Sequence, residues 1–356
     1  VGKPGCFAPG TEIMMYNGTI KKVEDVIVGD QLMGDDSTSR NVLELCHNEE
    51  MMYKITPKKG DSYVVNENHI LSLKCTGYND IPKGHVIDIT VKDFLQKSET
   101  FQYRYKWYRN KVEFPEKEVT LDPYLLGYWL GDGTSSCAQI TTADDEIINV
   151  FNDKLEDLQL FLSKSNNSPY RYQIKQENFS KKNHQFLNSL RQYNLIKNKH
   201  IPQDYKINSR ENRLQLLAGI LDSDGYYDSK GRGFDIIQKN EKLFDDIIYL
   251  ARSLGFAAYK NKCEKSCIYK DEQKTGIYYR CYISGIVDNI PCKIFRKQAE
   301  SRLINKDVLN TGFSIEKLDK GEYFGFVLDD NHRFLGGDFT VLHNTGKSTL
   351  IKALLH

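Results

Sequence analysis

The residues with the clearest chemistry stand near the two ends of the chain, and each end carries a group able to break a peptide bond. The thiol of Cys6 can attack the carbonyl of Gly5 through a five-membered ring and move the Gly5 acyl group from nitrogen to sulfur. Such intramolecular attack benefits from a high effective molarity, and glycine leaves the attacked carbonyl sterically open. At the other end, the side-chain amide of Asn344 can attack its own carbonyl and cut the bond to Thr345.

Two neighbours of this asparagine complete the set. His343 can donate a proton to the leaving nitrogen or polarise the Asn344 carbonyl. Thr345 supplies a hydroxyl that can attack the thioester on Cys6 and take over the N-terminal segment. Because an oxygen nucleophile is weaker than a thiol, we expect this exchange to be slower than it would be with cysteine. Together these groups predict the removal of residues 6–344 and the joining of the outer segments.

The outer segments form one motif when they are joined. Residues 1–5 followed by residues 345–348 spell G-x-x-x-x-G-K-S, the phosphate-binding loop of nucleotide triphosphatases. Taken singly, Cys6 and the His343–Asn344 pair are more simply read as a buried thiol and a turn, but chance does not leave a reconstructable motif on both sides. In the unspliced chain the loop is divided by 339 residues (344 minus 5), so we exclude nucleotide triphosphatase activity for this form.

Composition sets the class of protein. A chain of 356 residues has room for two or three domains, and its 49 basic and 48 acidic residues nearly cancel, so any nucleic-acid surface requires local clustering. Eight irregularly spaced cysteines, one of which must stay reduced, indicate an intracellular, reducing setting such as the cytoplasm or nucleus. Without a run of 18 apolar residues or a signal-peptide pattern, we expect no membrane partner.

The first 115 residues read as short strands and tight turns. Asn17-Gly18 predicts a two-residue hairpin, and a second strand pair is expected around residues 52–55 and 63–65. The opening residues 6–11, Cys-Phe-Ala-Pro-Gly-Thr, resemble the N-terminal splicing block of inteins. In that family a T-x-x-H motif carries a histidine that activates the first scissile bond. The resemblance assigns this role to His69, with Asn66 in the usual threonine position as a hydrogen-bond donor of the oxyanion-hole type.

The last part of the chain resembles the C-terminal intein block. His332 matches the internal histidine of that block and is a candidate proton-transfer partner for Asn344 cyclisation. Many family members carry aspartate where Gly325 stands, so other groups would have to coordinate the two cuts. The resemblance implies an all-β horseshoe splicing domain, of the type called Hint, formed by residues 6–115 and 303–344. Residues 1–5 and 345–356 would then be flanks of the host protein.

The middle of the chain contains an internal repeat. Asp122-Pro123 predicts a helix start, followed by Leu-Leu-Gly-Tyr-Trp-Leu-Gly-Asp-Gly up to residue 133. A similar run ends at residue 225, with Asp224 in the place of Asp132, 92 residues apart (224 minus 132). Small residues four apart in each copy predict a close helix pair, and each helix is expected to stop at a glycine in the left-handed conformation.

The two aspartates of the repeat predict a metal site. Each acid stands at a helix C-terminus, where the dipole disfavours it, and the pair would also repel each other. A divalent cation held between Asp132 and Asp224 removes this conflict. Oxygen ligands suit Mg²⁺, and a metal shared by two acids suits phosphodiester hydrolysis.

These residues closely resemble the LAGLIDADG homing endonucleases in their two-motif, single-chain form. The resemblance implies an α+β domain over residues 116–302, with two pseudo-symmetric αββαββα-like halves that bind double-stranded DNA and cut both strands as a monomer. Lys199 falls in a K-x-I-P segment whose lysine lies near the scissile phosphate in the family, with a surface charge as the alternative. For the second half, Lys293 and Lys297 are the candidates.

Shorter patterns predict further elements. Thr142 is expected to cap a helix over residues 143–158, and Asn240 one over residues 241–254. Strands are expected at residues 170–174, 234–237 and 278–283. Residues 102–111 interleave aromatic and basic side chains, which fits a DNA contact or a strand with one aromatic face, and both interpretations remain open.

The sequence therefore predicts a self-splicing intein that also cuts DNA. The alternative is a splicing element whose middle domain only binds DNA or serves as a scaffold. The insertion point indicates that the DNA target is the uninterrupted host gene across the codons for Gly2 to Gly5 and Thr345 to Ser348.

Overall fold

The computed structural model describes residues 5–77, 80–166, 168–176, 184–269, 272–301, 303 and 305–344. The chain divides into two compact units, the first made of residues 1–112 and 307–356 and the second of residues 113–306. The first unit is thus assembled from both ends of the chain, and the second is inserted between them. Among the described residues, no helix is long and apolar enough to cross a membrane.

The first unit is built almost entirely of strands. They are β1 (Glu12–Met14), β2 (Ile20–Lys22), β3 (Gln31–Met33), β4 (Ser39–Pro57), β5 (Tyr63–Asn66), β6 (Ile70–Cys75), β7 (Val86–Thr90), β8 (Tyr105–Tyr108), β16 (Asn310–Thr311), β17 (Phe313–Leu328), β18 (Arg333–Leu335) and β19 (Val341–His343). Two short helices, α1 (Val91–Leu95) and α2 (Glu99–Arg104), lie between β7 and β8. The all-β splicing fold is confirmed.

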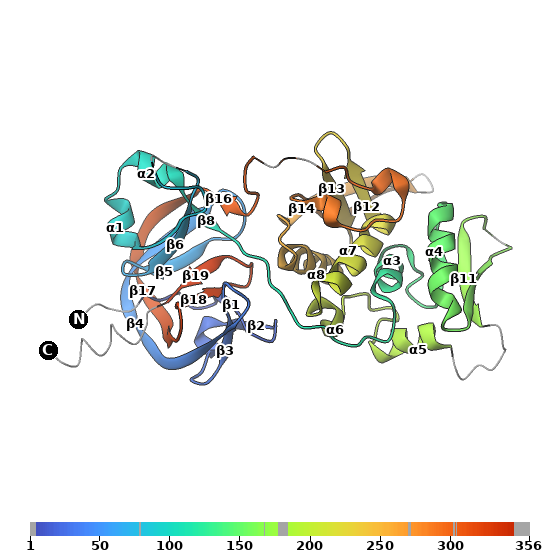
Figure 1. Cartoon of the computed structure of the whole chain (residues 1–356), viewed down its shortest axis with the longest axis horizontal. Helices are drawn as coiled ribbons and strands as arrows, with labels where there is room; N and C mark the ends of the chain where they lie inside the picture. Colours follow the sequence, from blue (N-terminus) through green and yellow to red (C-terminus); the bar gives the residue numbers. More distant parts are fainter. Residues whose placement is uncertain are drawn as a thin grey trace. The chain divides into compact units, whose positions relative to one another are not determined.

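The strands β4 and β17 form the longest pairing of this unit. They run antiparallel from Phe313 opposite Pro57 to Leu328 opposite Val42, with register shifts after Lys317 and Val327. Figure 1 shows the two strands as a long, curved ribbon pair, blue for β4 and orange-red for β17. The N-terminal and C-terminal parts of the chain are therefore bound together along a strand pair that neither part could form alone.

The predicted N-terminal hairpin is present, but residues 15–19 join its strands, so the connection is longer than the expected two residues. β1 and β2 pair antiparallel, and Gly18 in the turn has a φ of 79°, which favours glycine. The second predicted pair is also present, with Met52 opposite Asn66 and Ile55 opposite Tyr63.

Residues 102–111 belong to the core of the first unit. Tyr105, Trp107 and Tyr108 are buried, and Arg109 is buried in an ion pair with Asp338 at 2.7 Å. The aromatic strand interpretation is the correct one, because the aromatic face packs inward. Tyr103 and Lys111 are exposed and Arg104 and Lys106 are partly exposed, so a DNA contact through these side chains stays a prediction.

The second unit contains two similar halves. The first half comprises α3 (Pro123–Asp132), β9 (Gln139–Thr141), α4 (Asp145–Glu156), β10 (Leu160–Lys164), β11 (Arg171–Gln176) and α5 (Gln185–Gln192). After the short α6 (Gln203–Lys206), the second half comprises α7 (Arg210–Asp224), β12 (Gly225–Asp228), β13 (Gly233–Gln238), α8 (Glu241–Ser253), β14 (Asn261–Tyr269) and β15 (Glu272–Ile283). In the second half, β12 pairs with β13. At the equivalent place in the first half there is only an isolated β-bridge between Gly133 and Ile140 among the described residues. The α+β fold with two halves is confirmed.

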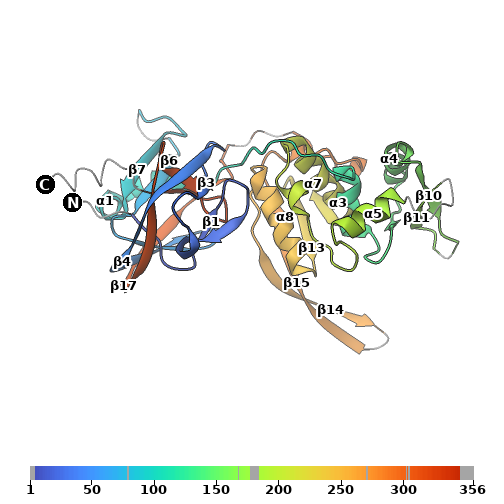
Figure 2. The same cartoon turned by 90° about the horizontal axis from the view of Figure 1, so that it is seen from below.

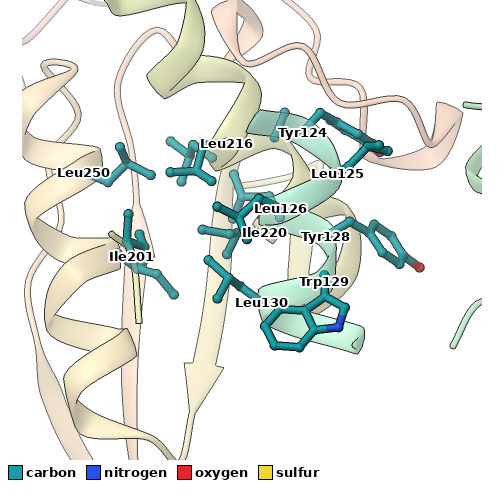
Figure 3. Close-up of a cluster of buried hydrophobic side chains, with 14 of the residues drawn as sticks. Tyr124, Leu125, Leu126, Tyr128, Trp129, Leu130, Ile201, Leu216, Ile220 and Leu250 are labelled. Carbon is teal, nitrogen blue, oxygen red and sulfur yellow. The ribbon is translucent and has the colours of Figure 1, made fainter. Parts of the chain in front are cut away.

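The helices α3 and α7 pack with their backbones in close contact. A Cβ atom on Gly127 would overlap the carbonyl oxygen of Leu216, and one on Gly219 would overlap the carbonyl of Tyr124. Side chains of both helices are buried in one apolar core, where Figure 3 shows Leu126 and Leu130 of α3 beside Ile220 of α7. The small residues four apart therefore allow the close helix pair that the repeat predicted.

Each half covers its helices with one antiparallel sheet. The strand order is β10-β11-β9 in the first half and β12-β13-β15-β14 in the second. Phe234, Ile236, Cys281 and Ile283 face the helices and are buried, whereas the alternating positions face away. Figure 2 shows β14 and β15 extending beyond the rest of their sheet as a long hairpin.

Two predictions about helix ends were wrong. Gly133 and Gly225 have φ values of −79° and −82°, so neither has the left-handed conformation. The reason for glycine is space, because a Cβ atom would collide with Trp129 at Gly133 and with Leu221 at Gly225. The chain can then continue from helix into extended backbone without a turn.

The helix starts agree better with the prediction. The side chains of Asp122 and Asn240 accept hydrogen bonds from the backbone N–H groups of Leu125 and Leu243, as expected of caps. Thr142 does not cap α4, because the helix begins at Asp145 and the Thr142 hydroxyl accepts a hydrogen bond from the N–H of Asp144 instead. The short side chain thus stabilises the turn that precedes the helix.

Candidate functional sites

Cys6 lies in the interior of the first unit, held by strands from both ends of the chain. The neighbouring Phe7 exchanges two backbone hydrogen bonds of 2.8 Å with Phe324 of β17 and bridges to Val65 of β5. The side chain of Cys6 is fully buried. A Cβ atom on Gly5 would lie 2.8 Å from the Cα atom of His69, so only glycine fits before the cysteine.

Asn66 contacts the first scissile bond in a different way from the one predicted. Its side-chain oxygen accepts a hydrogen bond of 2.9 Å from the N–H of Cys6, and its Nδ2 donates to Glu50 at 3.0 Å. The oxyanion-donor role is therefore not supported by these contacts. The amide instead holds the nitrogen that must leave when the Gly5–Cys6 bond breaks.

His69 lies close to the same bond and is buried. Its ring meets the Phe7 ring edge-on with 4.5 Å between centroids, and among the described residues its Nδ1 has no hydrogen-bond partner. Burial, with a smaller contribution from His343, lowers the pKa of His69 to about 3. The imidazole is therefore neutral at physiological pH.

The second junction is held at the end of a hairpin formed by β18 and β19. Asn344 is fully buried, and its backbone N–H donates to the carbonyl of His332 at 3.0 Å. The rings of His332 and His343 lie 5.9 Å apart, and Nδ1 of His332 donates to the carbonyl of Leu328 at 2.9 Å. This bond leaves Nε2 of His332 as the nitrogen able to exchange a proton.

Asp88 lies beside His343, although no pattern in the sequence predicts this contact. Its Oδ2 is 3.9 Å from Nε2 of His343, and the carboxylate is held by Arg333 at 2.6 Å and by the Ser72 hydroxyl at 2.5 Å. Burial lowers the pKa of His343 to about 4, and Asp88 opposes this shift by favouring the imidazolium. No motif marks Asp88, because its contact with the C-terminal hairpin is made only in the folded chain.

The first unit therefore gathers Cys6, Asn66, His69, His332, His343 and Asn344 from both ends of the chain. β19, which ends at His343, packs against β6, which begins directly after His69, so the groups at the two junctions lie near each other. Thr345, the predicted second nucleophile, lies outside the described residues.

The second unit places Asp132 and Asp224 at the C-termini of its two close helices. A Cβ atom on Gly131, next to Asp132, would lie 3.0 Å from Oδ2 of Asp224, which shows how near the two helix ends are. Burial raises the pKa of both carboxyl groups, and repulsion from Asp132 helps to raise that of Asp224 to about 6. Gln238 of β13, which the sequence did not single out, donates a hydrogen bond to Oδ2 of Asp224.

Two lysines occupy matching positions at these helix ends. The Nζ of Lys199 donates to the carbonyls of Gly131 and Gly133 at 3.0 and 2.7 Å, at the end of α3. The Nζ of Lys297 donates to the carbonyls of Leu221 and Asp222 at 3.0 and 2.6 Å, at the end of α7. Both ammonium groups thus satisfy terminal carbonyls and offset the negative end of a helix dipole.

The comparison of the two halves separates the two candidates for the second lysine. The backbone N–H of Lys293 donates to Asp222 in the last turn of α7, but its ammonium group lies 5.9 Å from the ring centre of Tyr124. Lys297 is therefore the structural counterpart of Lys199. Burial lowers the pKa of Lys199 to about 8 and also lowers that of Lys297, so both lysines are held in partly desolvated positions.

The two carboxylates fit a divalent cation that is completed by its substrate. Within the described ranges, no group of three or more His, Cys, Asp or Glu side chains could hold a metal ion. Mg²⁺ commonly binds through one or two carboxylates together with phosphate oxygens and water. The mutual repulsion of Asp132 and Asp224, which raises the pKa of Asp224, is the conflict that such a cation would remove.

Two family models match the chain. The Hom_end-associated Hint model matches residues 6–121, and the homing endonuclease model matches residues 200–303. The first model begins at Cys6, the proposed nucleophile, and the second covers the α7 motif with Asp224 and Lys297.

Relatives and solved structures show weaker likeness. The chain is 35% identical over 145 residues to the replicative DNA helicase DnaB of Mycobacterium intracellulare, covering 41% of this chain and 21% of the helicase. It is 21% identical over 481 residues to the catalytic subunit of the V-type proton ATPase of Candida tropicalis, covering 96% of this chain and 44% of the ATPase polypeptide. The chain thus spans less than half the length of these curated relatives.

Among solved structures, the gp41-1 intein is 20% identical and covers 24% of this chain and 59% of its own, with a TM-score of 0.20. I-DmoI in complex with DNA and Mn is 16% identical and covers 52% of this chain and 98% of its own, with a TM-score of 0.30. By the two family models, this chain combines a Hint domain of the type associated with homing endonucleases with a homing endonuclease domain.

Proposed function

We propose that the first unit removes residues 6–344 from its host by autocatalytic splicing. The observation that carries this proposal is the convergence of Cys6 and His69 with His343 and Asn344, which come from opposite ends of the chain. If Cys6 were only a buried structural thiol, nothing would require the groups of the C-terminal junction to lie in the same interior.

The first step is the shift of the Gly5 acyl group from nitrogen to the sulfur of Cys6. Asn66 holds the leaving nitrogen through its hydrogen bond to the Cys6 N–H. The backbone of His69 lies against Gly5, and its buried imidazole packs on the ring of Phe7, next to Cys6. Since His69 is neutral, it can accept a proton on one nitrogen and donate one from the other. The hydroxyl of Thr345 then attacks the resulting thioester.

The second cut is the cyclisation of Asn344. The carbonyl of His332 holds the backbone N–H of Asn344, while His343, beside the Asp88 carboxylate, can protonate the nitrogen of Thr345 as it leaves. Joining the flanks would restore a phosphate-binding loop from residues 1–5 and 345–348. The host is accordingly proposed to be a P-loop nucleotide triphosphatase, and the thiol chemistry requires a reducing compartment such as the cytoplasm or nucleus.

Mass spectrometry of freshly made precursor over time tests the splicing proposal. The expected products are a joined flank peptide of 17 residues (5 plus 12) and a freed insert of 339 residues. A precursor that stays intact under reducing conditions, while its fold is verified by circular dichroism, would contradict the proposal.

We further propose that the second unit cuts both strands of double-stranded DNA. Asp132 and Asp224 would hold Mg²⁺, which supplies Lewis-acid polarisation of a phosphate oxygen when bound. Lys199 and Lys297 place positive charge at the same helix ends, where they can stabilise negative charge that develops on the phosphates. I-DmoI structures have been solved with Mg, Mn or Ca, which supports a divalent metal without selecting one.

The DNA-binding surface is proposed to be the open faces of the two sheets. In the first sheet, Arg171, Gln173 and Lys175 alternate along β11 on the face opposite the buried Tyr172 and Ile174. In the second sheet, Arg280 and the exposed Tyr226 and Tyr282 occupy the corresponding face. Basic and amide side chains can read base edges in the major groove, and both motifs lie in one chain, so a monomer suffices.

A cleavage assay in Mg²⁺ decides between cutting and mere binding. The substrate is the uninterrupted host sequence across the codons for Gly2 to Gly5 and Thr345 to Ser348, and the control is the same DNA carrying the insertion. Cutting of the first alone supports the proposed target. Binding without cutting of either DNA would favour the alternative, in which the middle unit only binds DNA.

A further inference from the structure

A second thiol lies against the thiol that starts splicing. Cys46 is on β4, and its Sγ is 3.3 Å from Sγ of Cys6. The side chain of Cys46 is only partly buried, whereas that of Cys6 is fully buried. The chemistry described above gives this neighbouring sulfur no role.

The backbone is shaped to bring these two sulfur atoms together. Cys46 stands directly opposite Gly325 in the β4–β17 pair. A Cβ atom on Gly325 would overlap the sulfur of Cys6 and lie 3.0 Å from that of Cys46. The absence of a side chain at residue 325 therefore opens the space in which the two thiols meet.

The attacking thiol needs a base, because the thiolate is the nucleophilic form. Asn66 cannot accept a proton at neutral pH, and the Glu50 carboxylate is engaged by the side-chain amide of Asn66. His69 is placed beside Gly5, but its Nδ1 has no hydrogen-bond partner among the described residues. Cys46, by contrast, is a titratable side chain in direct contact with the Cys6 sulfur.

We propose that Cys46 is a further catalytic residue of splicing, which takes the proton of the Cys6 thiol as that sulfur attacks the Gly5 carbonyl. In this step the bond between the Cys6 sulfur and the Gly5 carbon forms and the Gly5–Cys6 peptide bond breaks. The proton that leaves sulfur is held by Cys46 and passes to the freed amine of Cys6, so no other reactant is consumed. The proposal rests on the splicing function proposed above.

The protonation of the pair places the thiolate on Cys46 before the attack begins. The hydrogen bond from Cys6 lowers the pKa of Cys46, whereas the same contact and burial raise the pKa of Cys6. The first proton lost by the pair therefore comes mainly from Cys46, which prepares a thiolate base next to a protonated nucleophile.

The test measures thioester formation in the full precursor carrying Asn344→Ala, which blocks the C-terminal cut. Hydroxylamine releases the N-terminal flank from any thioester, and the rate is followed by mass spectrometry from pH 6 to pH 9. The variants are Cys46→Ala, Cys46→Asp and, as a matched control, Cys75→Ser, a buried thiol in another strand of the same unit. Diamide oxidation tests the contact between the two thiols directly. A disulfide between Cys6 and Cys46 would lower the mass of the precursor by two hydrogens, and this loss should disappear when either cysteine is replaced.

We expect Cys46→Ala to slow thioester formation about 10²-fold at pH 7, within the range of general-base contributions, and to make the rate depend more steeply on pH. Cys46→Asp should restore part of the rate, and Cys75→Ser should keep it. Equal rates for Cys46→Ala and the parent, or a loss that is the same at every pH and is not restored by aspartate, would overturn the proposal. Failure of the parent to form any thioester would instead contradict the splicing function.

Discussion

The two proposed catalytic centres of this chain differ in burial and charge. In the splicing unit, Cys6, His69 and Asn344 are almost fully buried, and the histidine is kept neutral. In the endonuclease unit, Asp132 and Asp224 are only partly buried and lie beside two cationic lysines. One centre relies on close packing of neutral groups, and the other relies on charges.

This difference follows from where each substrate comes from. The bonds cut in splicing belong to the folded chain itself, so burial can align them and does not keep the substrate out. Each molecule needs to react only once. The endonuclease substrate is a polyanion that must enter from solvent, so its centre must stay open. Two acids at helix C-termini raise the energy of the empty site, which a divalent cation and phosphate would lower.

The largest expected effect separates the two centres completely. Replacing both Cys6 and Asn344 by alanine removes the nucleophile of the first step and the group that makes the second cut. Joining of the flanks should stop entirely, while DNA cleavage should keep its rate, because the aspartates belong to the other unit. Mass spectrometry and a plasmid-cleavage assay on the same preparation measure both activities. Joined flanks in this variant would disprove the splicing mechanism.

The reciprocal change should affect only the endonuclease. Asp224→Asn keeps the shape of the side chain and its contact with Gln238 but removes a metal-binding charge. DNA cleavage should fall about 10³-fold or more, because a bound metal contributes several kcal/mol of transition-state stabilisation. Splicing should be unchanged. Gln238→Ala, which removes a partner of the same carboxylate, provides a milder comparison.

The sequence named the candidate reactive groups most directly. Cys6, Asn344 and the paired Asp132 and Asp224 could be proposed because each proposed reaction needs particular residue types at particular positions, and the structure brings the two aspartates together at the ends of close helices. The close helix pair could also be predicted, since glycines four apart serve one local purpose. These signals lie within short stretches of sequence.

Groups that act through long-range contacts could not be found in this way. Asp88, Cys46 and Gln238 reach the centres only after strands distant in sequence have paired. The backbone conformation of the glycines that end α3 and α7 was predicted wrongly, because glycine is used both for left-handed turns and for close contacts. Lys297 was one of two candidates until the contact with the α7 carbonyls distinguished it.

The lysines test whether the two halves of the endonuclease are functionally equivalent. Lys199→Met and Lys297→Met each remove an ammonium group from one helix end, so each should slow cleavage about 10²-fold, a typical loss for one electrostatic contact to the transition state. Lys293→Met is the control and should retain cleavage near the parent rate, since the Lys293 ammonium lies over the Tyr124 ring, whereas that of Lys297 donates to the α7 carbonyls. Gel assays that separate nicked from linear plasmid show whether one strand or both strands are still cut. A loss with Lys293→Met equal to that with Lys297→Met would contradict the assignment.

Acid should act on the stability of the two units in opposite directions. In the splicing unit, the pKa of His69 is about 3 when folded and 6.5 when unfolded, so the unfolded state binds more protons between these values. Stability should therefore fall as pH decreases from 6.5 towards 3, by about 2 kcal/mol at pH 5 for this histidine. In the endonuclease unit, the pKa of Asp224 is raised to about 6 from 3.8, so the folded state binds more protons and acid favours folding.

Each unit contains one of the two tryptophans, Trp107 in the first and Trp129 in the second. In the Trp129→Phe precursor, fluorescence during urea unfolding reports the splicing unit, and in the Trp107→Phe precursor it reports the endonuclease unit. His69→Gln should remove about half of the acid sensitivity reported by Trp107, because His343, whose pKa is lowered to about 4, contributes a similar share. Asp224→Asn should remove the stabilisation by acid reported by Trp129. These two variants isolate the named groups from carboxylates such as Asp144, whose ion pair with Arg296 acts in the opposite direction. If His69→Gln leaves the pH dependence of the splicing unit unchanged, the histidine is not held neutral by burial, and the proton transfer proposed for it loses its physical basis.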